Sequence, residues 1–100
     1  METKKRTDAH FRSQDRPGFS IRFENGWTIS VQWHNGAYCE RKSISLSSFT
    51  DSNPAESATA EIAIWNESGD WYDFGSDQVL GYCTPDEVAD WITKTKSFEK

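Results

Sequence analysis

Residues 19–33, FSIRFENGWTISVQW, decide the fold, because two runs of alternating apolar and polar residues flank a central Asn-Gly pair. A two-residue turn at that pair would put the apolar side chains of the two strands on opposite faces of the sheet. A three-residue loop over residues 24–26 instead pairs Phe23 with Trp27 and brings both apolar sets to one face. The alternation therefore predicts a type I turn with a G1 bulge, in which Gly26 takes the left-handed conformation.

The same spacing recurs in residues 60–74, AEIAIWNESGDWYDF, where Gly69 is the last residue of a three-residue loop. The predicted cross-strand pairs are Trp65 with Trp71, Ile64 with Tyr72, and Ile62 with Phe74. In this register the two tryptophans lie on one face of the sheet, and the other four side chains lie on the opposite face. One of these faces must therefore serve something other than the main core.

A helix is predicted near the C-terminus. Thr84 suits the N-cap, Pro85 the first helical position, and Glu87 the third position of a capping box. The apolar side follows the helical repeat to about Lys96 and consists of Val88, Trp91, Ile92 and Thr95. The predicted fold class is α+β: an antiparallel sheet built from two or more hairpins, with about four or five strands, and one C-terminal α-helix packed on it.

The chain is expected to form one domain. We predict a flexible N-terminal arm over residues 1–18, a single α+β domain over residues 19–97, and a serine-rich loop at about residues 43–58. Ile44 and Leu46 leave room for a short edge strand before this loop.

Composition excludes several classes of function. The 11 Lys and Arg residues against 16 Asp and Glu give a net charge of −5, which disfavours general nucleic-acid binding. Apolar runs are far shorter than the roughly 20 residues that cross a bilayer, so we expect no membrane partner and a cytoplasmic location. Cys39 and Cys83 are expected to be reduced, and no ligand spacing typical of zinc occurs.

Residues 33–39, WHNGAYC, gather histidine, tyrosine and cysteine, but adjacency in sequence does not make a Cys-His nucleophile. We therefore predict no catalytic residues, no metal and no cofactor. An enzyme that uses His34 or Cys39 on a nucleotide signal stays open as a third hypothesis. The acidic run of Asp70, Asp73 and Asp77 does not have the spacing of an EF-hand.

Five tryptophans in a 100-residue chain are the most informative feature for function. Aromatic rings stack on bases, and arginine holds phosphate groups through two hydrogen bonds. The predicted ligand-binding residues are Arg22, Trp33, Tyr38, Arg41, Trp65 and Trp71. The alternative is that each ring fills the core or an oligomer interface. For Trp65 and Trp71, the core, an interface and a binding site all remain open.

The runs FENGWTISVQW and YC, followed by AEIAIW, WYDF and TPDEVADWI, resemble a group of small proteins encoded by bacteriophages and prophages. The resemblance covers residues 19–39 and 58–93. It implies an accessory protein that acts against host defences in the cytoplasm of an infected bacterium, and some such proteins sequester a nucleotide signal in pockets between subunits. It assigns no catalytic residue, and its functional content is an analogy.

The expected function is accordingly a non-enzymatic anti-defence protein, a homo-oligomer that sequesters a cyclic or ADP-ribose-derived nucleotide. The alternative is an acidic inhibitor that binds a host nuclease or another host defence protein. Its negative charge would come from Glu56, Glu61, Glu67, Asp70, Asp73 and Asp77.

Overall fold

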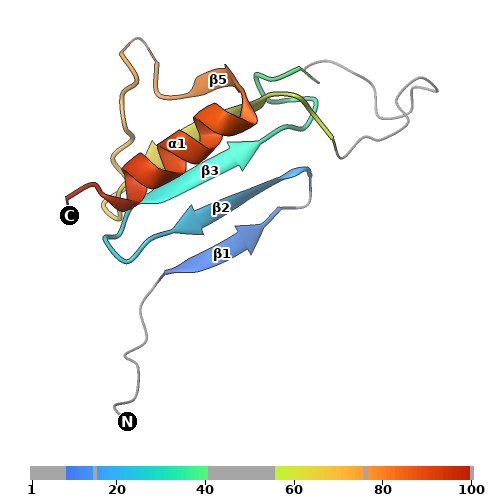
Figure 1. The fold of residues 1–100 in the computed structure, drawn as a ribbon. Coiled ribbons are helices and arrows are strands. Elements are labelled where there is room, and N and C mark those ends of the chain that lie inside the picture. Colours follow the sequence, from blue (N-terminus) through green and yellow to red (C-terminus); the bar gives the residue numbers. More distant parts are fainter. Residues whose placement is uncertain (1–8, 15, 41–55, 76, 100) are drawn as a thin grey trace.

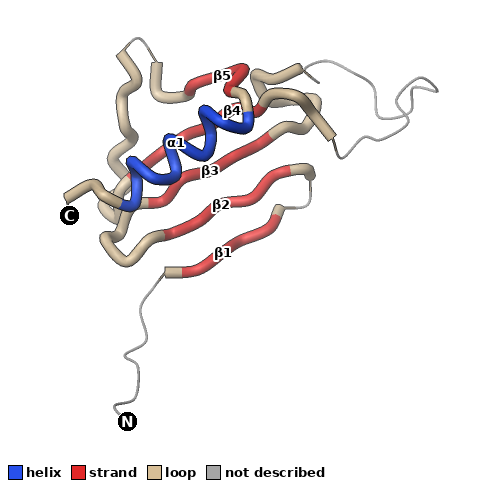
Figure 2. The backbone as a smooth tube through the Cα atoms, viewed as in Figure 1, coloured by secondary structure: helices blue, strands red, loops and turns tan. Residues whose placement is uncertain are grey.

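In the computed structural model, which describes residues 9–14, 16–40, 56–75 and 77–99, five strands form one antiparallel sheet in sequence order (Figure 1). The strands are β1 (His10–Ser13), β2 (Gly18–Arg22), β3 (Thr28–Gln32), β4 (Ala60–Trp65) and β5 (Leu80–Cys83). One helix, α1 (Pro85–Lys96), lies across one face of the sheet (Figure 2). The predicted α+β fold is therefore confirmed.

The first hairpin has the predicted register. Phe19 pairs with Val31 and Ile21 with Ile29. The backbone N–H of Phe23 donates to the carbonyl of Trp27 at 2.8 Å, and Gly26 N–H donates to the carbonyl of Phe23 at 2.9 Å. Gly26 has φ +91°, the left-handed conformation that the three-residue loop requires.

The second hairpin is confirmed only near its loop. Trp65 and Trp71 form a β-bridge, and Tyr72 N–H donates to the carbonyl of Ile64 at 2.7 Å. The predicted pair of Ile62 with Phe74 is wrong, because Ile62 pairs with Leu80 of β5.

The chain leaves β4 after Tyr72 because a local turn competes with the ladder. The Asp73 side chain accepts a hydrogen bond from Gly75 N–H at 2.8 Å, and Phe74 N–H donates to the Asp77 carbonyl at 2.9 Å. Aspartate and glycine favour such turns over strands. The Phe74 side chain still packs on the core, as the alternation predicts, but strand β5 takes its place in the sheet.

Helix α1 begins with the predicted capping box. Glu87 N–H donates to the Thr84 hydroxyl at 3.2 Å, and Thr84 N–H donates to the Glu87 carboxylate at 2.9 Å. The helix ends at Lys96, and its last turn is tied to the first hairpin. The Asn25 side-chain amide donates to the carbonyls of Thr95 and Phe98, both at 2.9 Å.

The core lies between α1 and the central strands. Its buried centre consists of Ile29, Val31, Ile62 and Ile64, with Ala60 and Cys83. The half-buried Trp91 covers it from the helix and packs edge-on against Tyr72 and Phe74. Helix α1 contacts β3, β4 and β5, and among the described elements it does not approach β1 or β2. On this side of the sheet the helix therefore lies over β3, β4 and β5 and leaves β1 and β2 outside its reach.

The structure moves the N-terminal boundary of the fold. His10–Ser13, which the sequence analysis placed in a flexible arm, pairs with β2 as strand β1. Every side chain of β1 is exposed. The sequence of this strand therefore lacks the alternation of apolar and polar residues by which a half-buried strand is predicted. Residues 1–8 and 41–55 lie outside the described residues, as do Ile44, Leu46 and most of the serine-rich loop.

The two loop glycines form a matched pair for testing the turns. Both have left-handed φ, +91° at Gly26 and +87° at Gly69. A Cβ at Gly26 would lie 3.0 Å from the Glu67 carboxylate, whereas a Cβ at Gly69 would meet nothing within 4 Å. We expect Gly69→Val to cost about 1 to 2 kcal/mol and Gly26→Val to cost more. Chemical denaturation measures both, and equal stability of Gly26→Val and the parent would contradict the register.

Asn25 is expected to matter more than a turn asparagine usually does. Asn25→Ala removes two hydrogen bonds to the end of α1 and one to the turn, so we expect a loss of about 2 kcal/mol in the free energy of unfolding. Asn66→Ala is the matched control, because among the described residues the Asn66 side chain accepts hydrogen bonds from Ser68 and Asp70 alone, both within its own loop. If urea titrations show a smaller loss in the free energy of unfolding for Asn25→Ala than for Asn66→Ala, the hydrogen bonds from Asn25 to the end of α1 do not have this role.

Candidate binding surface on the sheet

The sheet face opposite α1, called the open face below, carries three of the predicted ligand-binding residues. Arg22 lies opposite Thr28 in the register, and Thr28 lies opposite Trp65, so the three side chains form a row across β2, β3 and β4. Trp71 extends this row because it bridges to Trp65. The hairpin registers, rather than closeness in sequence, bring arginine and the two indole rings to one surface.

The two indole rings form a tilted stack. Their centroids are 5.3 Å apart and their planes are inclined by 31°. Trp65 is half-buried, whereas Trp71 keeps 45% of its surface exposed. Stacking on Trp65 restricts the Trp71 side chain, so the exposed indole is presented in one orientation to the solvent.

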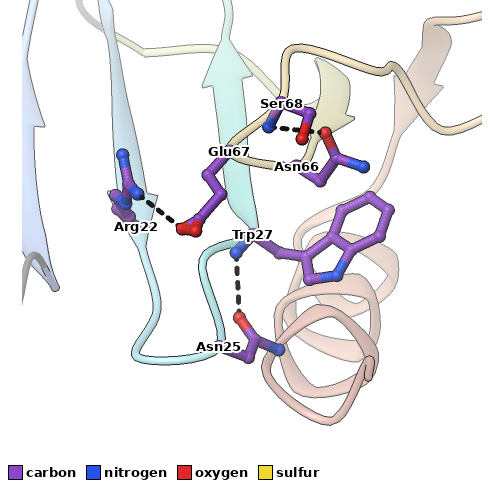
Figure 3. Close-up of polar contacts among 6 residues, drawn as sticks. All are labelled: Arg22, Asn25, Trp27, Asn66, Glu67 and Ser68. Carbon is purple, nitrogen blue, oxygen red and sulfur yellow. Dashed lines mark hydrogen bonds and ion pairs between the residues drawn. The ribbon is translucent and has the colours of Figure 1, made fainter. Parts of the chain in front are cut away.

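Arg22 is held by the loop of the second hairpin. Its guanidinium lies 3.3 Å from the Glu67 carboxylate, and Figure 3 shows this pair joining the two hairpins. The side chains are 26% and 61% exposed, so solvent screens the pair and its net contribution is about 0 to 1 kcal/mol. This ion pair by itself therefore adds little to the stability of the fold.

Beside this row the open face carries small side chains. Ser20 lies opposite Ser30, and Ser30 lies opposite Ala63. All three are buried even though α1 covers the other face. Arg22 and Trp65 lie in the neighbouring row on one side of them, and Gln32 lies on the other side.

Beyond the small side chains, a chain of hydrogen bonds fixes the orientation of His34. Gly36 N–H donates to His34 Nδ1 at 3.0 Å, so the ring proton is on Nε2, which lies 2.6 Å from Gln32 Oε1. Gln32 Nε2 in turn donates to the Ser30 hydroxyl at 3.0 Å. Burial, and secondarily the positive charge of Arg16, lower the pKa of His34 and favour its neutral form.

The cysteines are not arranged as nucleophiles. The Cys39 thiol donates to the backbone carbonyl of His34 at 3.5 Å, not to its ring, and Cys39 is 1% exposed. Burial, with a smaller effect of the Glu87 carboxylate, raises the pKa of Cys83 to about 11 and keeps that thiol protonated. Among the residues that the structure describes, no three His, Cys, Asp or Glu side chains gather as metal ligands.

The predicted ligand-binding set is divided by the fold. Arg22, Trp65 and Trp71 share the open face. Trp33 lies on the α1 side of the sheet, where its ring meets Phe19 edge-on at 6.1 Å.

Two predicted residues remain. Tyr38 lies beside β5, where its carbonyl accepts from Tyr82 N–H at 2.8 Å, and Arg41 is outside the described residues. Sequence reasoning missed Glu67 as the partner of Arg22, and the only available signal was its position in a loop of the same length as the first.

No protein family model, curated protein or solved structure matches this chain. Within the described residues, the single helix is too short and too polar to cross a membrane.

The lowered pKa of His34 predicts a pH effect on stability. The folded state holds the neutral ring, so the stabilisation is present above the reference pKa of 6.5 and is lost as the pH falls below it. We expect the unfolding midpoint of the parent to approach that of His34→Gln as the pH is lowered through this window. Thermal unfolding at a series of pH values tests this, and a constant difference between the two proteins would contradict it.

Proposed function

We propose that this is a non-enzymatic binding protein and that its open face is the recognition surface. The observation that carries the proposal is the row formed by Arg22, Trp65 and Trp71, with Trp71 exposed and Arg22 in a weak surface ion pair. The ligand class that fits is a flat ring bearing a negatively charged group. A cyclic or ADP-ribose-derived nucleotide has this chemistry.

The indole and guanidinium groups of the row would bind different parts of a nucleotide. The base stacks on Trp71, a contact that contributes about 1 to 3 kcal/mol in other nucleic-acid-binding proteins. The phosphate takes the place of Glu67 at the Arg22 guanidinium, which binds planar anions through two hydrogen bonds. One local cation is enough for a small ligand, so the net charge of −5 does not oppose binding.

The biological setting of the proposal comes from the resemblance to phage proteins. A protein that holds a nucleotide signal without converting it would lower the free concentration of that signal and so blunt a host defence.

The test is calorimetry and thermal shift against a panel of cyclic and ADP-ribose-derived nucleotides, with the recovered ligand checked for chemical change. We expect Trp71→Ala to weaken binding about 5- to 150-fold, as loss of one stacking contact implies. Arg22→Gln should also weaken binding, whereas Glu67→Gln should not, because it removes the competing carboxylate.

Tyr38→Ala is the matched control, since Tyr38 is also about half exposed but lies beside β5. Binding that depends on Tyr38 and not on Trp71 would move the site away from the open face. If no nucleotide in the panel raises the melting temperature, the sequestration proposal fails.

The alternative function, an acidic inhibitor of a host protein, is supported by the loop between β4 and β5. Glu67, Asp70, Asp73 and Asp77 are all exposed there. Two of these carboxylates also shape the loop, because Asp73 and Asp77 accept backbone hydrogen bonds. A host protein retained by the parent and by Trp71→Ala, but lost with Asp70→Asn, would favour this function over nucleotide binding.

A further inference from the structure

The two edges of the sheet differ in how they are protected. At the β5 edge, Tyr82 has φ +57° and its N–H donates to the Tyr38 carbonyl at 2.8 Å, so that edge is bent and already has a neighbouring segment. At the other edge, β1 pairs with β2 on one side, and no other described strand lies on its outer side. An exposed strand edge is a template for pairing with another chain.

The alternation of hydrogen bonds shows which backbone groups of β1 face outward. The bond from Phe23 N–H to the Trp27 carbonyl makes this a hydrogen-bonded pair, so Ile21, two residues earlier, also bonds toward β3. Phe11, opposite Ile21, is therefore in a non-hydrogen-bonded pair with β2. The N–H and carbonyl groups of Phe11 and Ser13 consequently point away from the sheet.

The side chain of Phe11 is also unusual for a strand edge. It is 82% exposed, the most exposed of the large hydrophobic residues described. It lies on the same face as the half-buried Phe19 and Ile21, in the part of the sheet that α1 does not reach. Charged residues and Pro commonly guard exposed edges, and β1 contains one such residue, Arg12, next to Phe11.

We propose that β1 pairs antiparallel with β1 of a second copy of this chain, with Phe11 on the two-fold axis. Equivalent faces of the two sheets must stay on the same side, so directly opposed residues must both have odd or both have even numbers. Only two such registers pair three residues within His10–Ser13. One centres on Arg12 and sets two guanidinium groups opposite each other, which is unfavourable.

The register centred on Phe11 has no such conflict. It sets Phe11 against Phe11 in a hydrogen-bonded pair, through the backbone groups that point outward, and it sets His10 against Arg12. The two rings cover each other beside Phe19 and Ile21, which explains an exposed phenylalanine at this edge. Such an isologous contact closes as a dimer and leaves no further β1 edge free.

The proposed dimer deepens the function proposed above, but it does not depend on the ligand. The row of Arg22, Thr28 and Trp65 begins opposite His10 of β1. Pairing at β1 therefore joins the open faces of the two copies into one surface with two equivalent sets of Arg22 and Trp71. This gives a nucleotide-binding oligomer whose subunit contact does not use the tryptophans.

Disulfide cross-linking of cysteine variants tests which residues of the two β1 strands lie opposite each other. In a hydrogen-bonded antiparallel pair the Cα atoms are about 5.5 Å apart, a distance that a disulfide spans. With a mild added oxidant, we expect Phe11→Cys to form a covalent dimer on a non-reducing gel and Ser13→Cys, which lies off the axis and keeps Arg12, to run as a monomer. The native Cys39 and Cys83 are buried and serve as the internal background. Absence of a covalent dimer in Phe11→Cys would overturn the register.

Charge exchange then tests whether the contact is self-complementary. The parent should be dimeric by light scattering across a concentration series, and Phe11→Lys and Phe11→Glu should each be monomeric, because like charges meet on the axis. Mixing the two variants should restore a dimer. Circular dichroism checks that both remain folded, and Trp71→Ala, which should remain dimeric, separates this contact from the ligand site. A monomeric parent, or no dimer on mixing, would overturn the proposal.

Discussion

The structure depends on one side chain, Asn25, at the tip of the first hairpin. Its carbonyl oxygen accepts from Trp27 N–H at 3.0 Å and holds the turn, as Figure 3 shows. Its amide nitrogen donates to the carbonyls of Thr95, in the last turn of α1, and of Phe98, just after it. A single amide thus sets where the helix ends relative to the sheet. Because the capping box at Thr84 sets where the helix begins, the position of α1 is determined at both ends.

The position of α1 determines which surfaces remain for recognition. The helix contacts β3, β4 and β5 on one face, and among the described elements it reaches neither the opposite face nor the strip formed by β1 and β2. The open face carries Arg22 and the tryptophan pair, and the uncovered strip carries Phe11. Both sets of side chains lie where no helix packs, and exposed aromatic groups of this kind usually mark interaction sites. The one helix of the described residues packs on one face of the sheet, and Phe11 and Trp71 lie outside its reach and stay exposed.

Sequence reasoning succeeded where a local rule controls the backbone. The three-residue loops at Gly26 and Gly69, the face assignment of Trp65 and the capping box all depend on residues within a few positions of one another. Prediction from the sequence failed where two local backbone preferences compete, and where a strand has no buried side chains that would produce an apolar pattern. Asp73 and Gly75 turn the chain out of the predicted hairpin, and β5 replaces it. Strand β1 has four exposed side chains and therefore shows no burial pattern to detect.

The candidate site shows the same division between local and long-range information. The sequence by itself determined that Trp65 and Trp71 pair and that they point away from Ile62 and Ile64, because side chains alternate strictly along a strand. Only the tertiary structure decided that Arg22 joins them while Trp33 and Tyr38 do not. That outcome depends on which strands become neighbours and on the side that the helix takes. Both are settled by packing between segments far apart in the chain, for which no local spacing carries a signal.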